Sequence, residues 1–549
     1  MSKQKTNLVH DSQTKNSSGV QIIPFRQKER GFGWLQKTGL TEQEPKYIEV
    51  SGVPVKEFGK RLLWLKQEGQ AQWSIGEMVT NPLSQRLPFK NDQIKVRVYE
   101  PTTANRKVSS ETLKRNESWF LQQSQELKKS VPSNELIDST QYSLFDFYYL
   151  PDPDLFYKTF VFKKFSDDVF AKKNHAWFRP LYSGCYATVL AKAHEEIAAN
   201  QKLMFASNNY LGLATDPDLI RAAQDATAKY GVGTGGSNVL SGTMDIHVKL
   251  QFEVAAWLKK EDTLLFVSGY AANVGTLSAL LRKDDLVLCD ELSHASIHDG
   301  IRLSEARKIN FKHNDLNHLE HLMKKNASSA AGKLLVFESV YSMDGDEAPI
   351  KEYIKLAKKY GYRTYVDEAH GIGVCGEYGR GLCDELNVLE EIDVYMGTFT
   401  KAIGSSGAFV SGSKTLINYL RYYARSQFFS TSLAPAQVAA SRMGIHKLQT
   451  QPELKEKLFE NILYFKKCLK ENGFDTTDDV SPIIPVVVGN SQRLREISRD
   501  LETKGIYVSP VAYPAVPEKS CRLRFSLMNS HTFENLKWTA EQLAKAFQK

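Results

Sequence analysis

The sequence predicts an α/β protein in which a layered sheet follows a separate N-terminal extension. From Trp177 onward, strand-like apolar runs alternate with helical patterns, and this alternation is typical of a sheet covered by helices. The chain has 549 residues, more than the roughly 250–300 at which a single core stops growing, so we expect two or three folded units. Near the C-terminus, two helical patterns around strand-like SPIIPVVVG and CRLRFSL predict a smaller α+β domain.

The order of these patterns divides the chain into five segments. Residues 1–45 are polar and lack periodic apolar positions, which predicts a disordered tail. Residues 46–170 hold a helix-like VKEFGKRLLWLKQEG and a strand-like IKVRVYE, which indicate a folded extension of unknown role. The α/β unit begins with residues 171–230, continues as a large domain over residues 231–450 and ends in a small domain over residues 451–549. Its predicted strands include TLLFVSG, DLVLCDE, KLLVFESVY, YRTYVDEAH, DVYMGTFTK and GAFVSGS.

Composition excludes several classes of protein. Hydrophobic residues make up 42% of the chain and charged residues 24%, which excludes a mainly disordered or fibrous protein. Because no run of about 18 uncharged apolar residues occurs, we expect no transmembrane segment. The first residues lack the apolar core of a secretory signal, which predicts a cytoplasmic protein. The six cysteines show neither a CxxC pair nor a metal-type spacing, so we expect reduced thiols and no metal site.

The net charge of +8 is concentrated at the N-terminal end. Residues 1–110 hold 18 basic and 10 acidic side chains, a difference that equals the whole excess. Attraction for acidic partners such as carrier proteins, anionic lipid head groups or nucleic acid is therefore expected there, and a solvated basic tail is the alternative.

One candidate phosphate site lies in TLLFVSGYAAN, where an apolar strand ends at Ser268, Gly269 and Tyr270 and a helix begins. Free backbone N–H groups and the positive end of the helix favour an anion there, and a glycine lets the anion approach the backbone closely. An ordinary structural turn is the alternative.

A carboxylate and an imidazole follow a predicted strand in YRTYVDEAHGIG. Asp367 stands at the carboxyl end of the strand, the edge at which α/β sheets bind ligands, and His370 follows three residues later. Such an aspartate can hold a heterocyclic nitrogen protonated. A helix cap beside a surface histidine is the alternative.

A lysine stands in an unusual setting in GTFTKAIGSSGAFV. Lys401 ends a strand-like run among small residues, with hydroxyl groups nearby that could bind a phosphate. Those hydroxyls belong to Thr398, Thr400, Ser405 and Ser406. Small neighbours and nearby hydroxyls are what a lysine that forms a Schiff base needs, and an ordinary solvated lysine is the alternative.

Two further motifs offer an imidazole and guanidinium groups. His294 in CDELSHASIHDG follows a strand and could stack on an aromatic cofactor. Arg522 and Arg524 in CRLRFSLMNS could bind a carboxylate through paired hydrogen bonds. On an alternating strand both arginines face the same side, so spacing does not decide between them.

Taken in order, these motifs resemble the α-oxoamine synthase family of pyridoxal-phosphate (PLP) acyltransferases, which are similar to class II aminotransferases. The likeness runs from about Phe178 to the C-terminus, some two-thirds of the chain. The matching motifs are FASNNYLGL, GTGGSNVLSGT, SGYAAN, DELSHASIHDGIR, FKHND, SMDGDEAPI, DEAHGIG, GTFTKAIG, FFSTSLAP and RLRFS. The resemblance implies the fold-type-I architecture: a large PLP-binding domain with a mixed seven-stranded sheet, a smaller α+β C-terminal domain and here an extra N-terminal extension.

The resemblance also implies roles for individual residues. Lys401 matches the Schiff-base lysine that later moves the α-proton, Asp367 the partner of the pyridinium nitrogen and His370 the partner of the phenolic oxygen. His294 matches the imidazole stacked on the ring, and Ser342 a polar contact near it. The matches to the phosphate site are Gly269, Tyr270 and Thr398, with Ser430 and Thr431 from the partner subunit of a homodimer. Arg524 matches the residue that holds the substrate carboxylate, with Asn208 close by.

The reaction implied is the decarboxylative condensation of a small amino acid with an acyl thioester, carried by coenzyme A or a carrier protein. The segments FRPLYSGCY, IHVKLQFEVAAWL and FKHND are more similar to the bacterial serine palmitoyltransferase-like branch, which favours serine and lipid biosynthesis. Activity like that of 8-amino-7-oxononanoate synthase or 2-amino-3-ketobutyrate ligase is the alternative. Asn238 stands where many relatives have arginine, and Gly407-Ala408 replaces a glycine pair, which leaves the substrates open.

Other interpretations concern the N-terminal extension. A fused carrier domain would use Asp138-Ser139, but Thr140 and a basic surrounding depart from the carrier pattern, so a docking module or a dimer-stabilising arm fits better. A DNA-binding winged helix would need SIGEMVTNPLSQRLPFKN as its recognition helix, which Pro82 and Pro88 interrupt, so no nucleic acid partner is expected. A non-catalytic subunit would lack the lysine present here. Peripheral contact with a membrane stays open.

Overall fold

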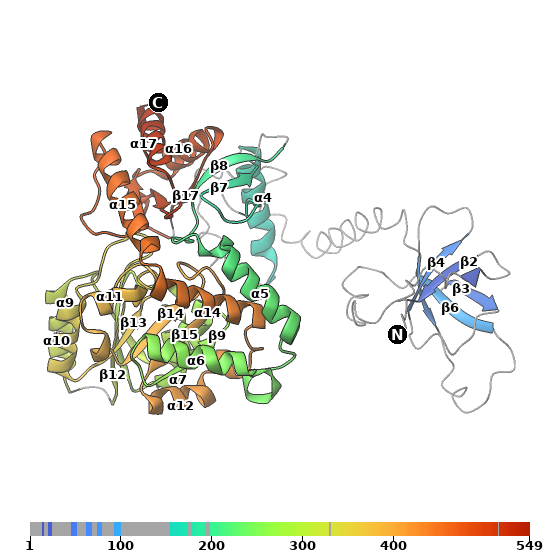
Figure 1. Cartoon of the computed structure of the whole chain (residues 1–549), viewed down its shortest axis with the longest axis horizontal. Coiled ribbons are helices and arrows are strands. Elements are labelled where there is room, and N and C mark those ends of the chain that lie inside the picture. The colour runs from blue at the N-terminus through green and yellow to red at the C-terminus, as the bar shows by residue number, and fades with distance from the viewer. Residues whose placement is uncertain are drawn as a thin grey trace. The chain divides into compact units, whose positions relative to one another are not determined.

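The computed structural model describes the strands of an N-terminal sheet within residues 14–99, and residues 154–549 except 173–177, 193–197, 329–330, 514 and 549. The chain divides into two compact units, Met1–Glu135 and Leu136–Lys549. Figure 1 shows the elements of both units.

The first unit contains an antiparallel six-stranded sheet in the order β1-β2-β4-β5-β6-β3. Its strands are β1 (Thr14–Lys15), β2 (Val20–Pro24), β3 (Lys46–Ser51), β4 (Leu62–Gln67), β5 (Ser74–Met78) and β6 (Gln93–Tyr99). The strand predicted from IKVRVYE is confirmed as β6, where apolar and charged residues alternate with the period of a strand.

Two predictions for this unit are wrong. The helix predicted over VKEFGKRLLWLKQEG is replaced by β4 in its second half, because its run of four apolar residues suits a strand that pairs with β2 and β5 on both sides. Residues 1–45, expected to have no fold, contribute β1 and β2. The strand β5 covers the start of the segment considered as a recognition helix. Residues 79–92 and the pair Asp138-Ser139 lie outside the described residues.

The large sheet of the second unit has seven strands in the order β11-β10-β12-β13-β14-β15-β9. They are β9 (Asp262–Phe266), β10 (Leu286–Asp290), β11 (Arg307–Phe311), β12 (Lys333–Glu338), β13 (Arg363–Asp367), β14 (Val394–Thr398) and β15 (Ala408–Gly412). Strands β10 to β14 are parallel, and β15 is antiparallel to both neighbours. The predicted mixed seven-stranded sheet is confirmed, and only β11 was missing among its predicted strands.

Helices cover both faces of this sheet, so neighbouring residues on one strand enter opposite cores. On β12, Leu334 and Val336 pack with α7, α8 and α12, whereas Leu335 and Phe337 belong to the core shared with α6, α9, α10 and α14. Burial on both faces explains the continuous apolar runs in the sequence. The helices of the large domain are α5 (Pro217–Tyr230), α6 (Asp245–Trp257), α7 (Gly269–Leu280), α8 (Ala295–Ser304), α9 (Leu316–Lys325), α10 (Ile350–Tyr360), α11 (Leu382–Glu385), α12 (Lys414–Tyr423), α13 (Arg425–Phe428) and α14 (Pro435–Thr450).

The smaller domain has a five-stranded sheet in the order β16-β18-β17-β8-β7. Its strands are β7 (Thr188–Ala191), β8 (Asn200–Phe205), β16 (Ile483–Val487), β17 (Ile506–Val511) and β18 (Arg522–Ser526), and its helices are α15 (Glu453–Glu471), α16 (Ser491–Thr503) and α17 (Phe533–Gln548). Helix α4 (Tyr157–Ala171) precedes β7. Because β8 pairs in parallel with β17, the start of the unit is built into the same sheet as its end (Figure 1).

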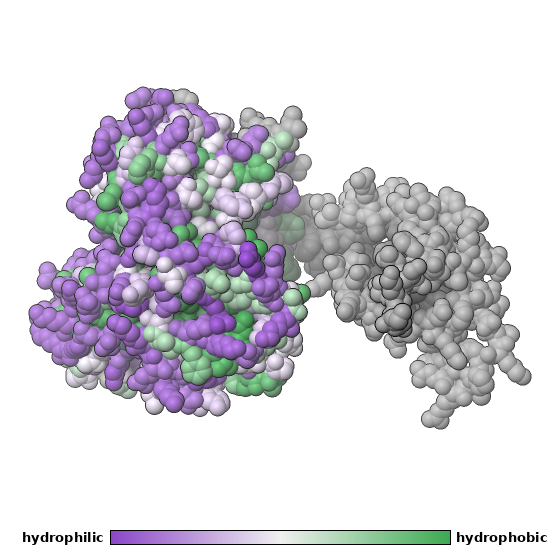
Figure 2. Space-filling view, viewed as in Figure 1, coloured by the Kyte–Doolittle hydropathy of each residue, from purple (hydrophilic) through white to green (hydrophobic). Residues whose placement is uncertain are grey.

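Short helical turns occupy Leu213–Thr215, Glu377–Gly379, Leu389–Glu391 and Glu518–Ser520, with a π-helical turn at Asn238–Gly242. The face of the second unit seen in Figure 2 is mainly hydrophilic, with apolar residues scattered across it. Among the described helices, none is long and apolar enough to cross a membrane. All six cysteines are free.

Candidate active site

The predicted functional residues gather where several strands of the large sheet end. Strands β10, β12, β13 and β14 are parallel, and β9 runs in the same direction because both β9 and β14 are antiparallel to β15. Their carboxyl ends therefore meet at one edge, where open α/β sheets bind ligands.

The N-terminus of α7 forms an anion cradle at this edge. The Ser268 Oγ accepts a hydrogen bond from the Ala271 N–H at 3.1 Å. The N–H groups of Gly269 and Tyr270 make no hydrogen bond to any other described residue, so they are available to an anion. A Cβ on Gly269 would stand 3.9 Å from Thr398 Oγ1 and 3.2 Å from Met396 Cε, so the missing side chain keeps this space open.

Asp367 is buried and rigidly oriented. Its Oδ2 accepts a hydrogen bond from Asn273 Nδ2 at 2.7 Å, and its Oδ1 accepts one from the Ala369 N–H at 2.9 Å. The Tyr365 hydroxyl donates to Asn273 Oδ1 at 2.6 Å, which fixes the orientation of that amide. Helix α7 thus supplies both the anion cradle and the support of this carboxylate.

Lys401 lies in the turn after β14, which the Gly404 N–H closes by donating to the Lys401 carbonyl at 3.0 Å. Burial lowers the pKa of the Lys401 amine, against the opposing charges of Asp367 and Glu338. Burial also raises the pKa of the Glu338 carboxyl well above its usual range, and the charge of Asp367 adds to this effect. The turn therefore holds an amine that gives up its proton more readily than a solvated lysine.

His370 belongs to a polar chain that crosses to the small domain. Its Nδ1 lies 2.8 Å from the Tyr210 hydroxyl, which is 3.2 Å from Asn208 Oδ1. Arg524 Nη1 donates to the same Asn208 oxygen at 3.2 Å. Burial lowers the pKa of His370 well below its usual range, and the charges of Lys401 and Arg524 lower it further, so the imidazole is neutral.

The two arginines of β18 have different partners. Arg522 forms an ion pair with Asp344 and also donates to the Met343 carbonyl. Arg524 donates to the Ser342 carbonyl at 2.6 Å and to Ser526 Oγ at 2.7 Å. Within the described part of the chain, no carboxylate pairs with Arg524, which leaves its charge available to a ligand.

His294 is the N-cap of α8, and its exposed ring lies beside the edge of the sheet. Its Nδ1 is 2.7 Å from Ser296 Oγ, and its backbone N–H donates to Glu338 Oε1. Strand β12 thus supports the turn that carries this imidazole.

Other predicted residues are not joined to this group. The Tyr270 hydroxyl is half exposed and donates to Asp299 Oδ2 at 2.6 Å, so only its N–H faces the cradle. Ser430 Oγ lies 3.4 Å from the Thr431 carbonyl, and Thr431 pairs with Ser237 in an isolated bridge. Within the described residues, neither hydroxyl contacts Gly269 or Thr398.

Sequence reasoning missed three residues of the site. Glu338 ends its strand as Asp367 does, and this shared position could have identified it. Asn273 and Tyr210 stand inside the motifs SGYAAN and SNNYLGL, yet their support of Asp367 and His370 depends on contacts between distant segments.

The donor set fits pyridoxal phosphate. Two free N–H groups at a helix N-terminus suit a phosphate, an oriented carboxylate suits a protonated ring nitrogen, and an amine of lowered pKa suits a carbonyl carbon. These three features lie on α7, β13 and the turn after β14.

Comparison with known proteins agrees with this assignment. Residues 200–543 match the family described as aminotransferase class I and II. Serine palmitoyltransferase of Sphingobacterium spiritivorum is 39% identical over 381 residues, 69% of this chain and 94% of that protein. The 8-amino-7-oxononanoate synthase of Alkaliphilus oremlandii is 42% identical over 352 residues, 64% of this chain and 89% of the relative.

Solved structures show the same likeness. Serine palmitoyltransferase of Sphingomonas wittichii superposes with a TM-score of 0.68 at 31% identity, over 72% of this chain and 98% of that one. The 8-amino-7-oxononanoate synthase of Francisella tularensis gives a TM-score of 0.55 at 26% identity, over 63% and 97%. The chain belongs to the aminotransferase class I and II family and, within it, to the PLP-dependent α-oxoamine synthases, which condense an amino acid with an acyl thioester.

Proposed function

We propose that this enzyme condenses L-serine with a long-chain acyl thioester and releases CO₂. The relative from Sphingobacterium spiritivorum, named serine palmitoyltransferase, supports this choice because the match covers 94% of its length. Condensation of alanine or glycine with another acyl group is the second candidate, favoured by the 42% identity to 8-amino-7-oxononanoate synthase.

The charge of Arg524, which pairs with no carboxylate of the described residues, is the observation that supports an amino acid as the substrate. Its neighbour Arg522 is neutralised by Asp344, whereas the buried Arg524 has only neutral partners among the described residues. A buried guanidinium without a counter-ion is costly, and a substrate carboxylate would supply one. Asn208, which accepts a hydrogen bond from the same guanidinium, would stand beside that carboxylate.

The remaining roles follow from the chemistry of each side chain. When bound, PLP withdraws electrons from the α-carbon of the amino acid, which allows that carbon to lose a proton and attack the thioester. Lys401 would bind the cofactor carbonyl and would be freed as an amine when the amino group of the substrate takes its place there. Its Nζ would then accept the α-proton, as its lowered pKa favours. Asp367 would keep the ring nitrogen protonated, and His294 would cover one face of the ring.

His370 would hold the phenolic oxygen of the cofactor. The Tyr210 hydroxyl has one proton, and Asn208 Oδ1 already accepts a hydrogen bond from Arg524, so that proton would go to the nearer His370 Nδ1. The neutral imidazole would then carry its own proton on Nε2, which can donate to the phenolic oxygen. Burial raises the pKa of Tyr210 to about 12, so the hydroxyl keeps its proton. Gly269, Tyr270 and Thr398 would hold the phosphate, and Ser342 would contact the ring region.

We further propose a homodimer in which Ser430 and Thr431 complete the phosphate site of the partner. Large apolar side chains are exposed near these hydroxyls and on α6, as a subunit interface would require. They include Leu240 at 83%, Phe429 at 69% and Phe252 at 71% exposure. Analytical ultracentrifugation of wild type and of Phe252→Glu tests the dimer; a monomeric wild type with full activity would exclude it.

Spectral titration tests the amino acid. The purified enzyme is titrated with serine, alanine and glycine while the visible absorption of its cofactor is recorded. Saturable change with serine at the lowest concentration supports the proposal, whereas preference for alanine supports the second candidate. The conservative substitution Arg524→Lys should raise the Kd for the amino acid by about tenfold or more, because a bidentate partner is lost.

A further inference from the structure

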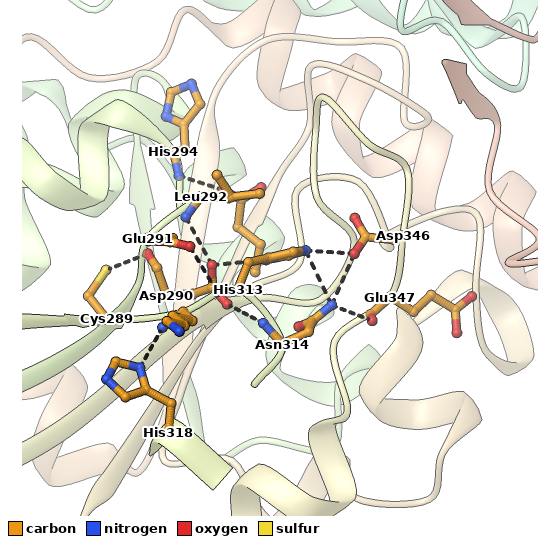
Figure 3. Close-up of polar contacts among 12 residues, drawn as sticks. Cys289, Asp290, Glu291, Leu292, His294, His313, Asn314, His318, Asp346 and Glu347 are labelled. Carbon is orange, nitrogen blue, oxygen red and sulfur yellow. Dashed lines mark hydrogen bonds and ion pairs between the residues drawn. The ribbon is translucent and has the colours of Figure 1, made fainter. Parts of the chain in front are cut away.

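His313 stands outside the proposed cofactor site and joins two of the loops that form it. It follows β11 in the FKHND motif, in the turn before α9. Its Nδ1 lies 3.0 Å from Asp290 Oδ1, and its Nε2 lies 2.7 Å from Asp346 Oδ2. Figure 3 shows the ring between the two carboxylates.

A neutral imidazole carries one N–H and could donate to only one of these carboxylates. The nitrogens of His313 lie 2.7 and 3.0 Å from the two carboxylates, and Asn314 Nδ2 lies 3.3 Å from Nε2. Two carboxylates at opposite ends of one ring favour a proton on each nitrogen, so we treat His313 as an imidazolium bridge with two charge-assisted hydrogen bonds. Its ring also packs perpendicular to the ring of Tyr341, with centroids 4.4 Å apart and planes at 87°.

The first carboxylate organises the turn that carries His294. Asp290 ends β10 and is fully buried; its Oδ1 accepts a hydrogen bond from the Leu292 N–H at 2.9 Å, and its carbonyl accepts one from the Ser293 N–H. These bonds shape the three-residue connection, residues 291–293, between the strand and His294, the N-cap of α8 (Figure 3). The position of His294 is therefore tied to Asp290.

The second carboxylate organises the loop that carries Ser342. The Asp346 carbonyl accepts a hydrogen bond from the Tyr341 N–H at 3.0 Å, which closes the loop, and Asp346 Oδ2 accepts a second side-chain bond from Asn314 at 3.0 Å. The Ser342 carbonyl in this loop accepts the hydrogen bond from Arg524. The position of the Arg524 guanidinium is therefore tied to Asp346.

We propose that His313 is a positioning residue that fixes the distance between His294 and Arg524, and thereby aligns the amino-acid substrate over the cofactor. The proposal rests on the proposed function, which places the cofactor ring under His294 and the substrate carboxylate at Arg524. His313 itself touches neither group. Its effect passes through Asp290 on one side and Asp346 on the other.

The test compares His313→Gln with His318→Gln. A glutamine at position 313 can donate to one carboxylate but cannot bridge two. His318 lies on α9 close by and accepts a hydrogen bond from the Lys312 N–H at 3.0 Å, without contact to either carboxylate, so the same substitution there is a matched control (Figure 3). The readouts are cofactor content, the Kd for the amino acid from cofactor absorbance, kcat, and the KM for the acyl thioester.

We expect His313→Gln to keep its cofactor, to weaken amino-acid binding and lower kcat by about tenfold each, and to leave the KM for the thioester within about twofold, since misplacement of orienting groups has effects of this size. The control should match wild type. A purely structural role would lower Tm but leave the amino-acid Kd of the folded enzyme unchanged, and that result would overturn the proposal.

A double-mutant cycle with Arg524→Lys gives a second criterion. If His313 acts through the placement of Arg524, the loss of amino-acid affinity in the double variant is smaller than the product of the single losses. If the loss of amino-acid affinity in the double variant equals the product of the losses in the two single variants, the proposal is wrong. If His313→Gln fails to fold, Asp346→Asn takes its place in the same assays with the same expected results. Asparagine keeps a hydrogen-bond acceptor at this position but removes the charge. If wild type itself shows no spectral response to any amino acid, the proposed function fails instead.

Discussion

The imidazolium bridge predicts a specific pH dependence of stability. Burial opposes the charge on His313, but hydrogen bonds to Asp290 and Asp346 outweigh it and raise the pKa of the imidazole from 6.5 to about 10. The raised pKa means that the stabilisation is complete below pH 6.5 and is lost as the pH rises through 10. Each pH unit changes this contribution to the free energy of unfolding by about 1.4 kcal/mol, so a rise from pH 7 to pH 9 would remove at most about 3 kcal/mol of it.

The side chain is 20% exposed, so solvent screening reduces this figure to roughly 2 kcal/mol. Urea unfolding of wild type, His313→Gln and His318→Gln at pH 7, 8 and 9 measures it. The free energy of unfolding of wild type should exceed that of His313→Gln at pH 7, and the difference should shrink by roughly 2 kcal/mol at pH 9. A difference that stays constant with pH would show that the ring is neutral at pH 7 and refute the bridge.

Three further predictions concern separate parts of the enzyme. Lys401→Ala should abolish multiple-turnover activity and the cofactor's absorption band while leaving the far-UV circular dichroism unchanged; retained turnover contradicts the assigned role. Gly300→Ala should destabilise the protein by about 1–3 kcal/mol in thermal or urea unfolding, because the new Cβ would stand 2.9 Å from the Asn273 carbonyl of α7, whereas Gly233→Ala, with nothing within 4 Å, should have little effect. Deletion of residues 1–135 should leave cofactor binding intact but weaken use of a carrier-bound acyl donor relative to acyl-coenzyme A; equal use of both donors would remove the docking role proposed for that unit.

Much of the large domain could be predicted from the sequence because its strands are buried on both faces. Their apolar runs end in polar residues such as Asp367 and Thr398, which mark the functional edge directly. The strand β11, with sequence RKINF, was missed because it lies at the edge of the sheet and exposes Arg307 and Lys308 to solvent, which breaks the apolar run.

The rest depends on contacts between distant segments. The pairing of β8 with β17 joins residues about 300 positions apart, and local patterns carry no information on such a pair. The choice between Arg522 and Arg524 is similar, since both lie on one face of β18 and only the ion pair of Arg522 with Asp344 distinguishes them.

The amino-acid part of the proposed site exists only where the large and small domains meet. Arg524 comes from the sheet of the small domain, whereas the Ser342 carbonyl that orients it comes from a loop of the large domain. That loop lies tightly against β16, because a Cβ on Gly345, which has a φ of +71°, would stand 2.2 Å from the Ile483 carbonyl. In the proposed function, the substrate carboxylate would therefore depend on the contact between the two domains, whereas Asp367 and Lys401, which would hold the cofactor, both lie in the large domain. Substitutions in the loop that holds Ser342 and Gly345 should thus weaken amino-acid binding more than they weaken cofactor binding.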